Sequence, residues 1–361
     1  MSGDAEFQIG ERKIGPRHPP YVIAELSANH LQHYSRALEV LEMAAAQGAD
    51  AVKLQTYRAD TITIDHDGPD FKIEGGLWGG MTLHQLYEAA YMPWEWHEPL
   101  MKRGRELNIH VFSSPFDASA IDLLASLDAV AYKIASFEAA DLPLIERAAS
   151  NGKPLIISTG IANLTEIEEA RAAAVRGGAS GVSLLHCVSG YPTPISECNL
   201  RTISDLRRRF PTTVIGLSDH TLGTVASTTA IALGTSIIEK HVTLSRGDGG
   251  PDASFSLAPV ELKRLVEDCR SAWEALGEVS YALKSSERGN MIFRRSLYAV
   301  ADIGAGDLIT HGNVRSIRPG FGMAPKRLPE ILGWRAARPI RRGEPLADNM
   351  IVRSFDQSAH S

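Results

Sequence analysis

The repeating pattern that decides the fold is clearest at residues 214–242, which read VIGLSDHTLGTVASTTAIALGTSIIEKHV. A short apolar run, Val214–Leu217, ends in polar residues and is followed by a segment with helical period. A second apolar run, Ile237–Val242, then follows. Short runs rich in β-branched residues are typical of buried parallel strands, and the segment between them predicts a crossover helix.

The same unit recurs from Tyr21 to about Leu283, which gives eight apolar runs in all. Eight alternating strand–helix units predict a (β/α)8 TIM barrel. An open doubly wound sheet is the alternative, but no GxGxxG motif follows the first strand. The remaining predicted strands are Tyr21–Ala24, Ala51–Leu54, Ile109–Phe112, Val130–Ala135, Leu155–Ile157 and Val182–Leu185.

Two regions depart from this rhythm. Residues 58–92 form a long insertion with four glycines around Trp78, and a lid over the active site or a peripheral hairpin are both open interpretations. After about Arg294, short strand-like runs alternate with Gly, Pro and Asn turns. We therefore expect a barrel domain over 1–285, a linker over 286–293 and a small mostly-β domain over 294–361.

The composition is that of an ordinary globular protein, with 361 residues, a net charge of −6 and 44% hydrophobic residues. The acidic balance gives no reason to expect nucleic acid or a membrane as a partner. No apolar run reaches the roughly 18 residues that span a bilayer, and the N-terminus lacks the apolar segment of a secretory signal. Three cysteines without a CxxC pair fit a reducing cytoplasm.

In a barrel of this kind the active site lies at the carboxyl ends of the strands. Every predicted strand ends in side chains that can bind or transfer protons. These side chains are Glu25, Lys53, Gln55, Ser113, Ser114, Lys133, Ser136, Glu138, Ser158, Thr159, His186, Ser189, Tyr191, Ser218, Asp219, His220, Glu239, Lys240 and His241.

Two histidines follow neighbouring strands. Ser218 and His220 share one face of their strand, as do Glu239 and His241, so His220 and His241 can converge on one point. Two neutral imidazoles with nearby oxygens suit a divalent ion such as Mn²⁺, completed by water and substrate. Two ordinary hydrogen-bonded histidines are the alternative.

Two lysines, Lys53 and Lys133, project from other strands with several hydroxyls near them. Two cations and converging hydroxyl donors predict a site for phosphate or carboxylate. A buried lysine can instead form a Schiff base, which would make the protein an aldolase. Pairing of both lysines with Glu25 and Glu138 in a purely structural role is a third possibility.

The motifs that carry these residues resemble the sialic acid synthase family over nearly the whole chain. They are AELSANH at 24–30, ADAVKLQT at 49–56, YKIASFE at 132–138, STG at 158–160, GLSDH at 216–220 and EKH at 239–241. The stretch RSIRPG at 315–320 resembles the antifreeze-like (SAF) domain of that family. AELSANH and GGPDASFS at 249–256 are most similar to its pseudaminic acid synthase branch.

This resemblance implies an enzyme that condenses phosphoenolpyruvate with an open-chain acetamido sugar, releasing phosphate. The sugar would be 2,4-diacetamido-2,4,6-trideoxy-L-altrose, with N-acetylneuraminate or legionaminate synthesis as the alternative. It also implies a divalent metal, Mn²⁺ or alternatively Mg²⁺ or Co²⁺, held by His220 and His241. The residues implied to bind phosphoenolpyruvate are Lys53, Ser114, Lys133, Ser136, Ser158, Ser189 and Ser218.

The resemblance further implies that the sugar and metal are lined by Gln55, Tyr191, Glu239, Asp252 and Arg318. Arg318 would reach into the partner subunit's site in a domain-swapped homodimer. Glu25, together with His220 and His241, would be catalytic, and Glu25 would handle the proton of the attacking water. A non-enzymatic alternative takes the antifreeze-like domain as the functional part, binding ice or glycan.

Overall fold

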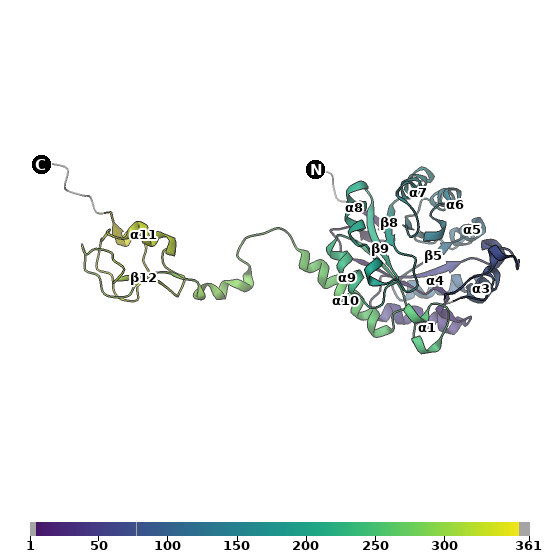
Figure 1. Ribbon diagram of the computed structural model, residues 1–361, viewed down its shortest axis with the longest axis horizontal. Helices are drawn as coiled ribbons and strands as arrows, with labels where there is room; N and C mark the ends of the chain where they lie inside the picture. The colour runs from purple at the N-terminus through teal and green to yellow at the C-terminus, as the bar shows by residue number, and fades with distance from the viewer. Residues whose placement is uncertain (1–4, 77, 354–361) are drawn as a thin grey trace. The chain divides into compact units, whose positions relative to one another are not determined.

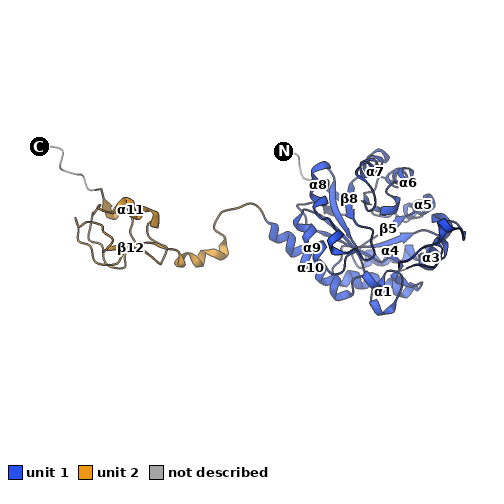
Figure 2. Ribbon diagram, viewed as in Figure 1, with its two compact units in different colours: residues 1–277 blue, residues 278–361 orange. Residues whose placement is uncertain are grey.

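The computed structural model describes residues 5–76 and 78–353. The chain divides into two compact units, residues 1–277 and 278–361 (Figures 1 and 2). Residues 354–361 of the predicted second domain lie outside the described residues. The predicted linker at 286–293 lies within the second unit, where it is helical.

The first unit is a closed barrel of eight parallel strands, which confirms the predicted fold (Figure 1). Strands that follow one another in the chain are neighbours, and the last strand closes the barrel by pairing Ile237 with Tyr21 and His241 with Glu25. The strands are β3 (Tyr21–Glu25), β4 (Ala51–Thr56), β5 (His110–Pro115), β6 (Tyr132–Ile134), β7 (Leu155–Ser158), β8 (Val182–Cys187), β9 (Val214–Asp219) and β10 (Ile237–His241).

Eight helices pack their apolar faces on the outside of the barrel and form one continuous core with it. In α7, Asn163 and Glu166 cap the first turn reciprocally, and Ile167 and Ala170 then face the core. The helices are α1 (Tyr34–Ala46), α4 (His97–Glu106), α5 (Ala118–Ser126), α6 (Leu142–Ala149), α7 (Leu164–Gly177), α8 (Arg201–Arg209), α9 (Val225–Ala232) and α10 (Pro259–Leu276).

Most of the strands extend further toward their carboxyl ends than the apolar runs indicate. Gln55, Ser114 and Ser218 lie inside β4, β5 and β9, although the sequence placed them beyond the strand ends. The backbone keeps its ladder hydrogen bonds whatever the side chain is, so a polar residue that faces a pocket does not end a strand. This geometry fixes the site residues on rigid backbone.

An antiparallel hairpin that was not predicted from the sequence, β1 (Phe7–Ile9) and β2 (Arg12–Ile14), precedes the barrel. Its side chains Phe7, Ile9 and Ile14 pack with Tyr21 and Phe112 in a second core that fills the barrel. Strands of three residues carry too little periodicity to be recognised. The barrel is therefore packed below its mouth and cannot act as a channel.

The insertion that precedes α4 is folded. It contains α2 (Ala59–Ile62), a 3₁₀ helix (Pro69–Phe71) and α3 (Leu83–Ala90). An antiparallel bridge joins Lys72 to Thr82, and Thr82 caps α3 reciprocally with Gln85.

The second unit is small and mostly β, as predicted. After the 3₁₀ helix Ser285–Phe293 it contains two antiparallel pairs, β11 (Ser296–Ala299) with β12 (Val314–Ile317) and β13 (Arg335–Ala336) with β14 (Ile351–Val352). It also contains the short helix α11 (Leu328–Ile331). It has its own core around Leu297, Val314 and Ile340. Across both units, no described helix is both long and apolar enough to cross a membrane.

Candidate active site

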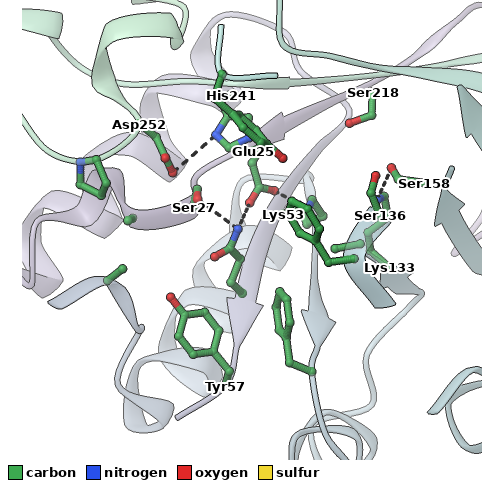
Figure 3. A pocket seen from close by; sticks show the side chains of 18 of the residues that line it. Glu25, Ser27, Lys53, Tyr57, Lys133, Ser136, Ser158, Ser218, His241 and Asp252 are labelled. Atoms are coloured by element: carbon green, nitrogen blue, oxygen red, sulfur yellow. Dashed lines mark hydrogen bonds and ion pairs between the residues drawn. The ribbon is translucent and has the colours of Figure 1, made fainter. Parts of the chain in front are cut away.

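A cavity of about 310 Å³ opens at the carboxyl ends of the barrel strands (Figure 3). Residues from all eight strands or the loops that follow them line it, because parallel strands bring their carboxyl ends to one rim. Of the residues that the sequence nominated, the lining includes Glu25, Lys53, Gln55, Lys133, Ser136, Ser158, Tyr191, Ser218, His220, Glu239, His241 and Asp252.

Two buried lysines supply the positive charge of this cavity. The Nζ of Lys133 donates hydrogen bonds to Ser158 Oγ at 2.6 Å and to the carbonyl of Ile134 at 3.1 Å. The Nζ of Lys53 donates to Ser114 Oγ at 3.3 Å, so Ser114 contacts the site through Lys53 although it does not line the cavity. Both ammonium groups are held in place by neighbouring oxygens before any ligand binds.

Two carboxylates stand against these lysines. The Nζ of Lys53 lies 2.8 Å from Glu25 Oε2 and 3.6 Å from Glu239 Oε1, and the Nζ of Lys133 lies 3.7 Å from Glu239 Oε1. Ser218 donates to Glu239 Oε1 at 3.2 Å. The other oxygen of Glu239 is buried and has no hydrogen-bond partner among the described residues. The charge network is therefore incomplete and can accept further donors.

Burial shifts the protonation of these groups in opposite directions. Burial raises the pKa of Glu25 to about 7, against the opposing charge of Lys53. Burial also lowers the pKa of Lys133. For Lys53 the effect of burial is outweighed by Glu239 and Glu25, which raise its pKa. Glu25 can thus exchange a proton near neutral pH beside a permanently charged lysine.

Two hydroxyls lie close to the loop after β7. The backbone N–H of Gly160 donates to Ser136 Oγ at 3.1 Å, and a side chain on Gly160 would collide with both Ser136 and Ser189. Glycine is required here because the loop backbone approaches these hydroxyls closely. Ser189 does not line the cavity, and its Oγ lies 3.9 Å from Cys187 Sγ.

The two histidines meet as their strand positions predicted, with ring centroids 5.4 Å apart. The Nδ1 of His220 lies 3.0 Å from the carbonyl of Val188. A donor there leaves Nε2 with a free lone pair. The Nδ1 of His241 is buried without a hydrogen-bond partner among the described residues, 3.7 Å from Asp252 Oδ2 (Figure 3).

This pair fits a divalent metal ion with an open coordination shell. Burial and the charge of His220 keep the pKa of His241 well below its ordinary value, so its imidazole is neutral. Burial acts against a charge on His220 too, but contact with Cys187 raises the pKa of His220, so metal binding there would release a proton. No cluster of three or more protein ligands forms a closed metal site in the described chain, and water or substrate would complete the shell.

Aromatic rings contact the two histidines, and an amide holds Glu25. The Tyr191 ring centroid lies 4.4 Å from that of His220, and the Phe255 ring lies 5.0 Å from His241. The Nε2 of Gln55 donates to Glu25 Oε1 and Ser27 Oγ, both at 3.0 Å. Gln55 thus fixes the position of the Glu25 carboxylate.

Glu138 lines the cavity, although no catalytic or binding role was predicted for it from the sequence, and the aromatic residues Tyr57, Trp78 and Tyr87 line it without having been predicted as site residues. Burial raises the pKa of Glu138 to about 7, and one of its oxygens has no hydrogen-bond partner among the described residues. The position of Glu138 after a strand end was the feature of the sequence that could have identified it as a site residue. The aromatic side chains gave none, since the insertion carries no recognisable motif.

Arg318 is the one nominated residue of the second unit, where it directly follows β12. Its guanidinium lies 6.0 Å from the centroid of the Phe293 ring.

Comparisons with known proteins agree with this architecture. Residues 40–281 match the NeuB family, and residues 294–352 match the SAF domain. The pseudaminic acid synthase of Helicobacter pylori is 41% identical over 93% of this chain and 99% of the relative. The N,N'-diacetyllegionaminic acid synthase of Campylobacter jejuni is 36% identical over 90% of this chain and 97% of the relative.

A solved structure shows the same fold. The N-acetylneuraminic acid synthetase of Leptospira borgpetersenii, crystallised with citrate, superposes with a TM-score of 0.71 at 30% identity, covering 81% of this chain and 96% of the other. The family match spans more than half of the chain, and the curated relatives match over nearly their whole length. The chain therefore belongs to the NeuB family.

Proposed function

We propose that this protein is a pseudaminic acid synthase. It condenses phosphoenolpyruvate with 2,4-diacetamido-2,4,6-trideoxy-L-altrose and water to give pseudaminic acid and phosphate. The observation that carries the proposal is one cavity that combines two buried lysines with a pair of imidazoles and a carboxylate that titrates near pH 7. The 41% identity to pseudaminic acid synthases, against 36% to a legionaminic acid synthase, supports this sugar over its alternatives.

The lysines and hydroxyls hold phosphoenolpyruvate. Lys53 and Lys133, with the hydroxyls of Ser136, Ser158 and Ser218, match the charges and acceptors of its phosphate and carboxylate. Ser114 and Ser189 lie beside these groups without lining the cavity: Ser114 accepts a hydrogen bond from Lys53, and Ser189 lies against Gly160. Donors fixed in advance stabilise the negative charge on phosphate as it leaves, without reorganisation.

His220 and His241 would hold a divalent metal ion, Mn²⁺ or alternatively Mg²⁺ or Co²⁺, with Glu239 and Asp252 beside it. When bound, the ion would supply Lewis-acid activation of the sugar aldehyde. Gln55 and Tyr191 position the sugar next to this pair.

In the reaction, the C=C electrons of phosphoenolpyruvate form a bond from its methylene carbon to the aldehyde carbon, and the aldehyde oxygen takes up a proton to become a hydroxyl. Water adds to the carbon that bears phosphate, and Glu25 accepts one proton of that water, which replaces the proton taken up by the aldehyde oxygen. The tetrahedral intermediate then expels phosphate with its bridging oxygen, and the second proton of the water leaves with the phosphate as the ketone forms. No lysine becomes covalently bound.

The second unit contributes Arg318 to the site of a partner subunit in a domain-swapped homodimer. Exposed apolar side chains on the loops that follow β6, β7, β8 and β9 support this, because they offer apolar surface for a partner to cover. These side chains are Phe137, Ile161, Ile195 and Leu222. The three cysteines Cys187, Cys198 and Cys269 are free thiols, which supports a cytoplasmic location.

The test incubates the purified protein with phosphoenolpyruvate, Mn²⁺ and a panel of acetamido sugars, and identifies products by mass spectrometry. The expected product is pseudaminic acid, and comparable kcat/KM with N-acetylmannosamine would instead indicate a neuraminate synthase. Label in the bridging oxygen of phosphoenolpyruvate should appear in phosphate. Label retained in the keto acid, or a lysine adduct trapped by borohydride, would contradict the mechanism.

A further inference from the structure

The insertion between β4 and α4 supplies the apolar half of the cavity. The other side chains around the cavity are mostly charged or hydroxylic, whereas those from residues 57–90 are aromatic or aliphatic. The lining residues of this segment are Tyr57, Ile62, Trp78, Leu86, Tyr87 and Ala90. The insertion therefore supplies much of the apolar surface that an uncharged part of the substrate can contact.

Trp78 is the member of this wall with an unused donor. Its indole Nε1 is buried and has no hydrogen-bond partner among the described residues. Two other indoles do have an acceptor. Trp94 donates to the carbonyl of Tyr57 at 3.2 Å, and Trp273 donates to that of Pro16 at 3.0 Å. A buried donor that stays unpaired is energetically unfavourable, so we expect a bound ligand to place a hydrogen-bond acceptor next to this N–H.

Backbone hydrogen bonds on either side of Trp78 hold this indole near Tyr191. The N–H of Ile73 donates to the carbonyl of Met81 at 2.9 Å, and the N–H of Gly80 donates to that of Ile73 at 3.0 Å. The Trp78 ring centroid lies 6.0 Å from that of Tyr191, whose ring in turn lies 4.4 Å from that of His220. Trp78 thus borders the part of the cavity next to the histidine pair.

We propose that the six lining residues of this segment form the wall that recognises the acceptor sugar, and that the indole N–H of Trp78 donates to the carbonyl oxygen of one of its acetamido groups. This inference rests on the proposed function. An acetamido group offers an acceptor and a methyl group together, and this wall offers both an indole donor and the aliphatic side chains of Ile62 and Leu86. Phosphoenolpyruvate does not fit this wall, because its charges are matched by Lys53 and Lys133.

The test compares Trp78→Phe, which keeps an aromatic ring and removes the donor, with Trp273→Phe as the matched control outside the cavity. Each variant is assayed with the diacetamido sugar and with two analogues in which one acetamido group is replaced by hydroxyl. Trp78→Phe should raise KM for the diacetamido sugar about three- to tenfold, the effect of one neutral hydrogen bond. Its kcat and its KM for phosphoenolpyruvate should stay within twofold.

With one analogue, the one that lacks the contacted acetamido group, the difference between Trp78→Phe and wild type should vanish. Trp273→Phe should show no such dependence on the sugar. Equal penalties with all three sugars, no penalty, or a penalty on phosphoenolpyruvate would overturn the inference. If Trp78→Phe is unchanged while wild type makes pseudaminic acid, the proposed function stands and only this inference fails; if wild type uses no sugar, the proposed function itself fails.

A second measurement covers the case in which Trp78→Phe does not fold. In wild-type protein with ¹⁵N-labelled indoles, the Trp78 N–H resonance is assigned by elimination, from the single resonance lost in a Trp→Phe variant at each of the other four tryptophans. Adding the diacetamido sugar should shift it, and phosphoenolpyruvate alone should not. An unshifted resonance at saturating sugar would overturn the inference.

Discussion

Neighbouring residues of β10, Glu239 and Lys240, take part in two buried charge networks with different outcomes. Glu239 faces the cavity, where it stands near Lys53 and Lys133 and keeps one oxygen unpaired. Lys240 faces the opposite side of the strand, since successive side chains alternate. Its Nζ lies 2.9 Å from Asp219 Oδ2 and donates to the carbonyl of Thr221 at 2.6 Å.

The outer network is closed. Asp219 accepts bonds from the N–H of Thr221 at 2.8 Å and from Ser227 Oγ, on α9, at 2.6 Å, in addition to its contact with Lys240. The inner network has spare acceptor and donor capacity beside a cavity. Burial alone therefore does not separate structural charges from functional ones, whereas the completeness of their hydrogen bonding does.

The largest effect on stability is expected from Lys240→Met, which leaves Asp219 charged, buried and without its cation. The free energy of unfolding should fall by about 3–5 kcal/mol, measured by urea denaturation. Adding Asp219→Asn should recover part of this loss, because the remaining buried group is then neutral. A loss in the double variant equal to the sum of the single losses would show that the pair is not coupled.

A pH-dependent effect is expected from Glu138, whose pKa burial raises from 4.5 to about 7. The folded state holds this proton more tightly than the unfolded state, so its contribution is full below pH 4.5 and is lost as pH rises through 7. Relative to wild type, Glu138→Gln should therefore gain up to about 3 kcal/mol between pH 4.5 and 8. Urea unfolding of metal-free protein at both pH values measures this, and a pH-independent difference would contradict it.

Lys53→Met tests the inner network. We expect kcat/KM for phosphoenolpyruvate to fall about a hundredfold, close to 2.7 kcal/mol, through loss of a charged contact to substrate. Stability should fall less than in Lys240→Met, because Glu25 can take up a proton near neutral pH. If Lys53→Met unfolds as easily as Lys240→Met and the folded fraction keeps its activity, the distinction between the networks is wrong.

The smallest effects are expected from a matched pair of serines. Ser227→Ala removes a donor to Asp219 and should cost about 1.5–2 kcal/mol of stability with kcat/KM within twofold. Ser218→Ala, which removes the donor to Glu239, should show the reverse, with about tenfold lower kcat/KM and less than 1 kcal/mol of stability lost. If Ser227→Ala lowered activity and Ser218→Ala lowered stability, the assignment of a structural role to the outer network and a functional role to the inner one would be wrong.

Much of the site could be predicted because a parallel barrel converts strand order into position. Once eight strands were recognised, Lys53, Lys133, His220 and His241 had to converge at one rim. Asp252 was nominated through the family motif, and its oxygen lies 3.7 Å from the Nδ1 of His241. The trans role of Arg318 stays a prediction.

The contribution of the insertion could not be predicted in the same way. Trp78, Leu86 and Tyr87 approach the cavity only because a hairpin and α3 fold back over the barrel mouth. Their spacing follows no repeating pattern, and a lid and a peripheral hairpin were equally compatible with it. The N-terminal hairpin that fills the barrel was missed for a related reason, since its strands of three residues carry no periodicity.

The sequence by itself determined the barrel, the small β domain and the chemical types gathered at the strand ends, because period, turn residues and strand order are local properties. Only the tertiary structure decided which of the buried charges are fully paired. Glu239 and Lys240 are adjacent and both buried, and nothing in the sequence distinguishes the closed network from the open one. Hydrogen-bond completeness depends on atoms from distant segments meeting within about 3 Å, a condition that only the packed fold can satisfy.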